Sequence, residues 1–434
     1  MFEIRSCYYY KSLRMLKFVG TVENEDVTRA EVYMDDEKIG EVNLNTYVID
    51  IARRAGSKEL NWCFSKVVDY SPNKRIVIKA YVGNSSKILE VKDIIIQDES
   101  PTEFISTIGK KNGLTVNGDA EKEARYVEKV RREEYKTPIS LLHIEISSNC
   151  NLECKYCIVS NGYNLIERGF ISDAVLDRAI EGINELKTIK NIQISALGEP
   201  TLNPQLVNIC ERIYKETYVR NIQFFTNGML FDRKLSDEIS KLPLNFKITF
   251  SVDGHTPEEN NSYRKGSDYE KVKKNIKYFL KKIEKKDNFW VRIHNLQINS
   301  QDDEDITPPE FLLNDFGNIQ IDAHRPFTFP SLLHHQLQEN GICVYAKAHK
   351  KICKRTFAET TIRHNGDVIR CHWDSKCEVV MGNILESSLK DIWLGDAYIE
   401  QRKKMMPEVP FDQLPEVCKR CHAMNEGFLY KAEK

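Results

Sequence analysis

The sequence contains no long apolar run and no excess of one charge. No uninterrupted hydrophobic stretch approaches the roughly 18 residues that a spanning helix needs, which argues against an integral membrane protein. Residues 1–18, MFEIRSCYYYKSLRMLKF, are interrupted by Arg and Lys and so lack the apolar segment of a signal peptide. Lys and Arg total 63 against 64 Asp and Glu, a formal net charge of -1. This balance argues against nucleic acid or an anionic membrane as the main partner.

Cysteine, by contrast, is abundant. The 434-residue chain has 12 cysteines, and the lack of a signal-like N-terminus leads us to expect a cytoplasmic protein. Disulfides are rare in that compartment, so this many thiols indicates metal binding or redox chemistry. Hydrophobic residues make up 41% and charged residues 29%, which is typical of a globular protein. The length favours two or three domains.

The hydrophobic pattern changes along the chain. Residues 1–100 contain short runs such as AEVYMDD, NTYVIDI, KRIVIKAYV and ILEVKDIII, which predict an antiparallel β-sandwich accessory domain. Residues 101–138 include DAEKEARYVEKVRREEYK, whose dense alternating charge predicts a solvated helical linker. Strand and helix patterns alternate over residues 139–330, and residues 331–434 hold six cysteines in a small separate domain.

The alternating region predicts the α/β class. Its expected strands are SLLHIEIS, NIQISA, NIQFFT, FKITFSV, FWVRIHNLQI and NIQIDA. Apolar residues recur at helical spacing between them, and Ser172 is placed to cap one such helix. Repeated βα units predict a parallel sheet, either open or curled into a barrel. In a barrel, the working residues lie on the loops that follow the strands.

Three cysteines follow the first of these strands directly. Cys150, Cys154 and Cys157 are separated by three and then two residues. Three thiolates in one loop can bind three corners of a cubane iron–sulfur cluster and leave one iron open for catalysis. A structural zinc site is the alternative, but it needs a fourth local ligand, and His143 lies inside the preceding strand.

A CxxxCxxC motif after the first strand of a βα barrel resembles the signature of the radical S-adenosylmethionine (SAM) enzymes. The resemblance implies a partial (β/α)6 TIM-like barrel and a SAM-binding [4Fe–4S] cluster. It also implies reductive cleavage of SAM to a 5′-deoxyadenosyl radical, which abstracts a hydrogen atom from the substrate. A reductase such as flavodoxin or ferredoxin would then be a partner, together with a small-molecule or peptide substrate.

Leu197-Gly198-Glu199-Pro200, after the second expected strand, looks like the GGEP motif of that family with Leu197 in place of the first glycine. By the resemblance, Glu199 would bind the SAM ammonium group, and Ser251 and Arg264 its carboxylate. Taken alone, a Thr-Asn-Gly or Asp-Gly sequence is equally typical of a plain turn. The full set implied for cofactor binding is Tyr156, Gly198, Glu199, Pro200, Asn227, Ser251 and Arg264.

The C-terminal cysteines form a second group. TTIRHNGDVIRC predicts a β-hairpin that ends at Cys371, and Cys418 and Cys421 form a CxxC. With Cys353 they supply four thiolates, which can enclose one metal centre completely. A zinc ribbon has the same CxxC spacing and stays open as an alternative.

The pattern also resembles the SPASM/Twitch extension of radical SAM enzymes, through Gly366-x4-Cys371, MGNI, the LKDIW helix start and the final CxxC. Because no cysteine follows Cys421, the resemblance implies the Twitch-like version with one auxiliary [4Fe–4S] cluster. Its ligands would be Cys353, Cys371, Cys418 and Cys421. A fully ligated cluster suits electron transfer.

Other residues have less specific patterns. Cys343 and Cys377 are either additional cluster ligands, thiols that return a hydrogen atom to the substrate, or ordinary cysteines without a role in the chemistry. His294 is predicted to meet substrate inside the barrel, and the histidines next to the C-terminal cluster cysteines, His372 and His422, to tune a cluster potential. The remaining thiols, Cys7, Cys63 and Cys210, are predicted to be structural.

These patterns favour a radical SAM oxidoreductase or epimerase. The first hypothesis for its reaction is oxidation or epimerisation of a sugar or sugar-derived alcohol, because the N-terminal region loosely resembles modules of polysaccharide-metabolising enzymes. Maturation of a ribosomally made peptide is the alternative. A non-catalytic iron–sulfur or zinc scaffold is a third.

Overall fold

The computed structural model divides the chain into two compact units, one built mainly from residues 1–126 and one that includes residues 127–282. Among the described residues, no helix combines the length and apolar character needed to cross a membrane. The described residues are 2–10, 15–22, 27–34, 37–43, 62–69, 75–82, 88–95, 127–157, 159–160, 167–297, 306–324, 342–348, 353, 355–374, 376–419, 421 and 425–431.

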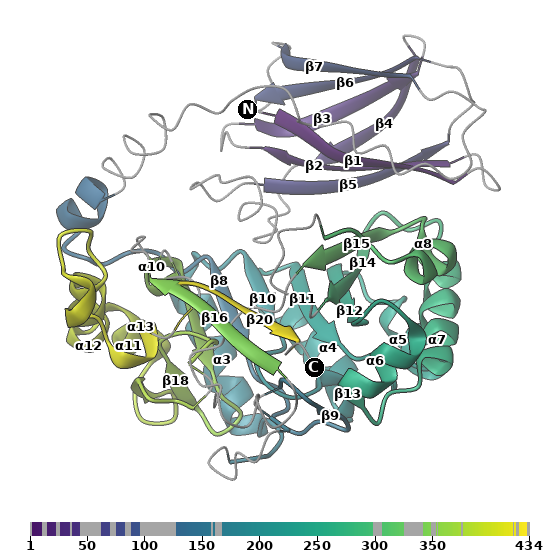
Figure 1. The fold of residues 1–434 in the computed structure, drawn as a ribbon. Coiled ribbons are helices and arrows are strands. Elements are labelled where there is room, and N and C mark those ends of the chain that lie inside the picture. The colour runs from purple at the N-terminus through teal and green to yellow at the C-terminus, as the bar shows by residue number, and fades with distance from the viewer. Residues whose placement is uncertain are drawn as a thin grey trace. The chain divides into compact units, whose positions relative to one another are not determined.

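The N-terminal unit consists of two antiparallel sheets, drawn as two layers in Figure 1. One sheet has the order β1 (Phe2–Tyr10), β2 (Met15–Val22), β5 (Trp62–Asp69). The other has the order β4 (Glu37–Asn43), β3 (Val27–Met34), β6 (Arg75–Val82), β7 (Ile88–Ile95). The predicted β-sandwich is confirmed, although the expected strand NTYVIDI lies outside the described residues.

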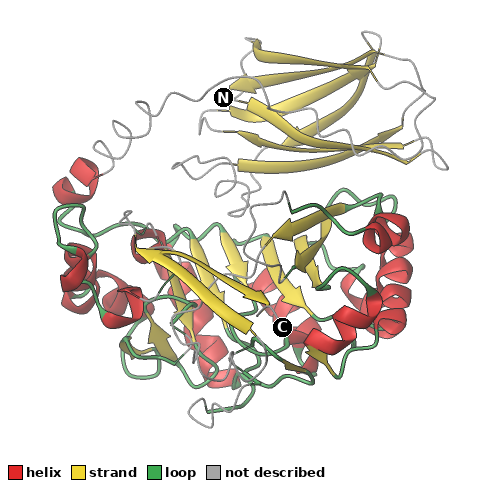
Figure 2. Cartoon of the chain, in the orientation of Figure 1, coloured by secondary structure: helices red, strands yellow, loops and turns green. Residues whose placement is uncertain are grey.

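The second unit contains the six predicted barrel strands, all of which are confirmed. They lie in one sheet with the order β15 (Gln320–His324), β14 (Phe289–Leu296), β12 (Asn245–Ser251), β11 (Asn221–Thr226), β10 (Asn191–Gln193), β8 (Leu141–Ile144). Neighbours from β8 to β12 pair in parallel. Figure 2 shows the helices that flank these strands: α3 (Asp173–Leu186), α4 (Leu206–Glu216), α5 (Arg233–Ile239), α6 (Pro257–Tyr263), α7 (Tyr269–Lys282) and α8 (Glu310–Phe316).

The two faces of this sheet differ in polarity. Phe250 on β12 and Phe279 on α7 both pack against Phe231, so the face of the sheet toward the helices is apolar. Successive side chains of a strand point to opposite faces. The opposite, inner face is polar, and it carries His143, Glu145, Gln193, Ser195, Gln223, Lys247, Thr249, Ser251, Arg292, His294, Asp322 and His324.

The predicted C-terminal hairpin joins the sheet of the barrel. Its first strand, β17 (Glu359–Ile362), pairs in parallel with β8 and extends the barrel sheet. β18 (Asp367–Ile369) and β19 (Val380–Asn383) follow as antiparallel neighbours. This pairing brings the loop after β17 beside the loop after β8, because both strands end at the same edge.

The remaining elements are the predicted linker helix, two further strand pairs and several short helices. A residue of the predicted linker helix, Val130, is buried, so that helix has an apolar face and is not fully solvated. Two short strands, β9 (Glu153–Cys154) and β13 (Arg264–Lys265), pair antiparallel, and β16 (Ile342–Ala348) pairs with β20 (Asn425–Lys431). The other helices are η2 (Pro200–Leu202), α10 (Arg355–Ala358), α11 (Leu389–Leu394), α12 (Asp396–Lys404), η3 (Phe411–Gln413) and α13 (Glu416–Lys419).

Candidate active site

The loop after β8 brings the first three cysteines together. Cys150 and Cys157 pack against Val159 and Leu197, and the backbone N–H of Cys157 donates to the carbonyl of Cys154 at 3.1 Å. Burial raises the pKa of Cys150 to about 11 and that of Cys154 to about 12, and the neighbouring thiolates add to the rise. Cys154 is buried, and Cys150 and Cys157 are half-buried. As thiolates, three thiols this close repel one another and need a cation to hold them deprotonated, so they suit an iron–sulfur cluster.

Gly198 allows the loop formed by Gly198, Glu199 and Pro200 (the GEP loop) to lie close to this site. Its φ is +70°, and a Cβ added there would lie 2.6 Å from the carbonyl oxygen of Asn149 and 2.7 Å from that of Ser147. The next residue, Glu199, donates its backbone N–H to the carbonyl of Asn149 at 2.7 Å. Only glycine combines this backbone conformation with so close a contact. The loop therefore lies directly against the residue before Cys150.

The Glu199 carboxylate is buried and is held by donors from its own loop and from the end of β11. It accepts hydrogen bonds from the Thr201 hydroxyl at 2.7 Å, the Thr226 hydroxyl at 2.8 Å and the Asn227 backbone N–H at 2.7 Å. Burial raises its pKa. The Asn227 side chain in turn donates to Asn151 in the cysteine loop at 2.8 Å. Glu199 and Asn227 thus join the ends of β10 and β11 to the cysteine loop.

Asp253 connects Tyr156 and Arg264, two predicted SAM-binding residues that lie far apart in the sequence. Its carboxylate accepts a hydrogen bond from the Tyr156 hydroxyl and forms an ion pair with Arg264 at 2.6 Å. Arg264 pairs through its backbone with Cys154. The Nε of Arg264 is buried and makes no hydrogen bond with the described residues, which leaves a donor for an anionic ligand. Ser251 ends β12 on the inner face, two residues before Asp253.

The four C-terminal cysteines also gather at one place. Cys371 and Cys421 share an apolar cluster with Trp373, and the N–H of Cys421 donates to the carbonyl of Cys418 at 3.1 Å. Burial raises the pKa of Cys418 to about 12, and repulsion by the thiolates of Cys353 and Cys371 adds to this rise. Four adjacent thiols, three of them buried and that of Cys353 half-buried, suit a fully ligated metal centre.

Cys377 is held by an arginine that follows β17. Arg363, directly after β17, donates through Nη1 to the Sγ of Cys377 and through Nε to Glu145 at 2.7 Å. Burial raises the pKa of the Cys377 thiol to about 11. His364 also contacts Glu145, at 3.0 Å. Cys377 is therefore a neutral thiol near the loop that leads to Cys150.

The other predicted residues differ in how far the structure describes them. The His294 ring lies on the inner face, 4.2 Å from His324 and 5.8 Å from Phe225 between ring centroids. Cys343 lies on β16 opposite Tyr430, and nothing is described of its side chain. Cys210 is fully buried on α4. The predictions for three other residues cannot be compared with the structure, because their side chains lie outside the described part of the chain: His422, Cys7 and Cys63.

The sequence reasoning missed several inner-face residues. Arg292 is fully buried, donates to Thr249 at 2.9 Å and pairs with Asp322 at 2.7 Å. Glu145 and Arg363 pair across β8 and β17. The available signal was the polar residue at every second position of otherwise hydrophobic strands, which indicates a polar inner face.

Comparison with protein families assigns both cysteine regions. Residues 144–306 match the model of the radical SAM superfamily, and residues 353–422 match that of an iron–sulfur cluster-binding domain, SPASM.

Several curated proteins are similar over part of their length. A GTP 3′,8-cyclase of Desulforamulus reducens is 30% identical over 29% of this chain and 37% of its own length. A second such cyclase, from Syntrophomonas wolfei, matches over 51% of its length, so the chain spans about half or less of these relatives. A tungsten-containing aldehyde ferredoxin oxidoreductase cofactor-modifying protein of Pyrococcus furiosus is 22% identical over 59% of this chain and 81% of its length.

Two solved structures illustrate the similarity in fold. BtrN in complex with AdoMet and 2-DOIA is 18% identical with a TM-score of 0.42, over 65% of this chain and 92% of that one. Streptococcus suis SuiB bound to precursor peptide SuiA is 14% identical with a TM-score of 0.45, over 73% of this chain and 78% of that one.

Proposed function

Because the chain belongs to the radical SAM superfamily and carries a SPASM domain, we propose that it oxidises or epimerises a sugar or sugar-derived alcohol. The two domains imply a SAM-binding [4Fe–4S] cluster and auxiliary [4Fe–4S] cluster chemistry. When the SAM-binding cluster and SAM are both bound, they would supply a 5′-deoxyadenosyl radical, which removes a hydrogen atom from the substrate. The other steps depend on residues of this chain.

We assign the cluster and SAM contacts to the residues that the loops bring together. Cys150, Cys154 and Cys157 hold the first cluster, and the four C-terminal cysteines hold one auxiliary cluster. Arg264, oriented by Asp253 and with its Nε available, binds the SAM carboxylate. Glu199, fixed by its three neighbours, receives the SAM ammonium group together with the adjoining backbone of Gly198 and Pro200.

The polar inner face supports a hydroxyl-rich substrate. Serine, threonine, histidine and glutamine side chains line the strands at positions that point away from the helices. A substrate with several hydroxyl groups can exchange hydrogen bonds with a surface of this kind. His294 and Ser251 lie near the carboxyl ends of β14 and β12, which is the working edge of a barrel.

Of the two proposed reactions, oxidation and epimerisation, the position of Cys377 favours epimerisation. Its thiol is half-buried, neutral and held by Arg363. After a hydrogen atom leaves one face of a carbon, the S–H of Cys377 supplies a hydrogen atom to the other face. The resulting sulfur radical needs one electron and one proton to become a thiol again, and the external reductase supplies that electron.

Anaerobic reconstitution with iron, sulfide, SAM and dithionite tests the assignment. The wild-type protein should release 5′-deoxyadenosine, and a Cys150→Ala variant should not. Incubation with candidate sugars in deuterated water should place one deuterium at the inverted carbon. The Cys377→Ala variant should still form 5′-deoxyadenosine but no epimer. If deuterium instead enters a supplied precursor peptide, the chain is a peptide maturase. If the wild-type protein forms no more 5′-deoxyadenosine than the Cys150→Ala variant, the chain does not act as a radical SAM enzyme.

A further inference from the structure

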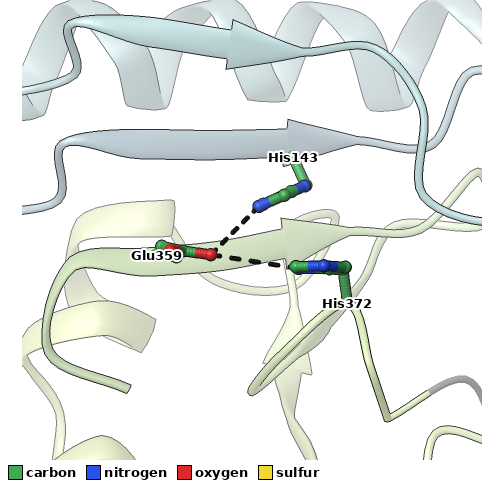
Figure 3. Close-up of side chains that lie close together, drawn as sticks. All are labelled: His143, Glu359 and His372. Carbon is green, nitrogen blue, oxygen red and sulfur yellow. Dashed lines mark hydrogen bonds and ion pairs between the residues drawn. The ribbon is translucent and has the colours of Figure 1, made fainter. Parts of the chain in front are cut away.

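A buried group of charged and aromatic side chains joins the barrel to the four-cysteine site. His143 comes from β8, Glu359 begins β17, and His372 directly follows Cys371 (Figure 3). The Glu359 carboxylate lies 3.4 Å from Nε2 of His143 and 3.9 Å from Nδ1 of His372. The two imidazole rings stack with their centroids 4.3 Å apart. One strand of the barrel is thereby in contact with the residue next to a proposed cluster ligand.

These three residues have the spacing of a metal site, since their ligand atoms all lie within 4.8 Å of one another. A positive charge is already present, however. Nη1 of Arg355 lies 3.1 Å from the Glu359 carboxylate and 3.4 Å from Nε2 of His372. A divalent cation bound to the same carboxylate would be repelled strongly by the buried guanidinium. The arrangement therefore favours arginine as the cation of this group.

Arg355 also faces the cysteines. Its guanidinium carbon lies 3.9 Å from the centre of the Trp373 ring, and Trp373 packs against Cys371 and Cys421. The backbone N–H of Trp373 donates to the Sγ of Cys371 at 3.5 Å. Arg355 is only 8% exposed, so solvent screens its charge weakly. Burial lowers the pKa of Arg355, but the Glu359 carboxylate and, after it, the thiolates of Cys371, Cys353 and Cys421 outweigh this effect and raise it.

We propose that Arg355, opposed by Glu359, is a positioning residue that sets the reduction potential of the auxiliary cluster. Reduction adds negative charge to a cluster, and a fixed buried cation stabilises that charge. Arg355 therefore raises the potential, while the Glu359 carboxylate lowers it by partly neutralising the guanidinium. Because Glu359 is held by His143 on β8, the barrel strand itself fixes this balance. The proposal rests on the four-cysteine ligand set assigned above.

Spectroscopic redox titration of the reconstituted protein tests the proposal without any need for turnover. In Arg355→Gln, the equilibrium constant for reducing the auxiliary cluster should fall at least tenfold, which is about 59 mV for a one-electron couple. Glu359→Gln should shift the potential in the opposite direction. Arg355→Lys, which keeps the charge, should stay close to the wild type. Arg212→Gln, which removes an outer charge that pairs with Glu216 and Asp177, should have no effect.

Iron and sulfide analysis separates failure of this proposal from failure of the ligand assignment. About eight irons per chain, four for each of two cubanes, shows that both clusters are present. With that content, an unchanged potential in Arg355→Gln, or shifts of the same sign in the Arg355 and Glu359 variants, overturns the proposal. So does a non-iron divalent metal that is lost in His143→Ala. About four irons with one zinc would instead refute the auxiliary cluster itself.

Discussion

Replacing Gly198 with alanine tests whether the GEP loop is held as tightly against the cysteine loop as the structure indicates. An alanine at φ +70° has the left-handed conformation, which costs about 1–2 kcal/mol. Its Cβ would also lie 2.6 Å from the Asn149 carbonyl oxygen, and forced overpacking of this kind costs roughly a further 1–3 kcal/mol. Both contacts are with backbone, so no side chain can turn away. The predicted total is about 2–5 kcal/mol.

Gly266 offers a matched control. Its φ is +93°, but the nearest atom to an added Cβ is a side-chain carbon of Leu152 at 3.3 Å. Gly266→Ala should therefore show the conformational cost with little overlap. Thermal unfolding followed by circular dichroism should give a larger fall in Tm for Gly198→Ala, by roughly 2–4 °C for each kcal/mol of overlap. Equal Tm values for the two variants would show that the close approach at Gly198 is not real.

Three other variants test separate parts of the structure. Ser172 caps α3 by accepting from the Val175 N–H at 3.3 Å, so Ser172→Ala should cost about 1 kcal/mol of stability, while Ser172→Asp should retain it in the same melting assay. Burial raises the pKa of Cys210 from 9.0 to about 12. Between these pH values the folded state keeps a proton that the unfolded state loses, so the free energy of unfolding should fall as the pH rises from 9 towards 12. In Cys210→Ala the fall should be shallower than in the wild type, and an unchanged slope would contradict the assignment. Cys371→Ser should reduce iron from about eight to about four per chain and leave 5′-deoxyadenosine formation intact, with loss of all iron as the contrary result.

Local patterns predicted most of the fold. The six barrel strands, the N-cap at Ser172 and the hairpin around Gly366 each depend on residues within a few positions of one another, and each is confirmed. The parallel pairing of β17 with β8 joins segments more than 200 residues apart. No periodicity in the sequence indicates which strand edge a distant hairpin occupies, so this pairing could not be predicted from the sequence.

The candidate site divides in the same way. The CxxxCxxC spacing indicated a three-thiolate site, since those residues share one loop. By contrast, Asp253 reads as part of an Asp-Gly turn, and only the folded chain places it between Tyr156 and Arg264. The pairing of Arg363 with Glu145 and Cys377 likewise requires β17 to lie beside β8.

The sequence by itself determined the superfamily, because its chemistry depends on cysteines at short, fixed separations. It also determined the number and kind of the barrel elements through hydrophobic periodicity. Only the tertiary structure decided that Arg363 holds Cys377 and that Arg355 lies between the four-cysteine group and the barrel. Those relations depend on which buried charges share one low-dielectric site, and burial is a property of the packed chain rather than of any segment.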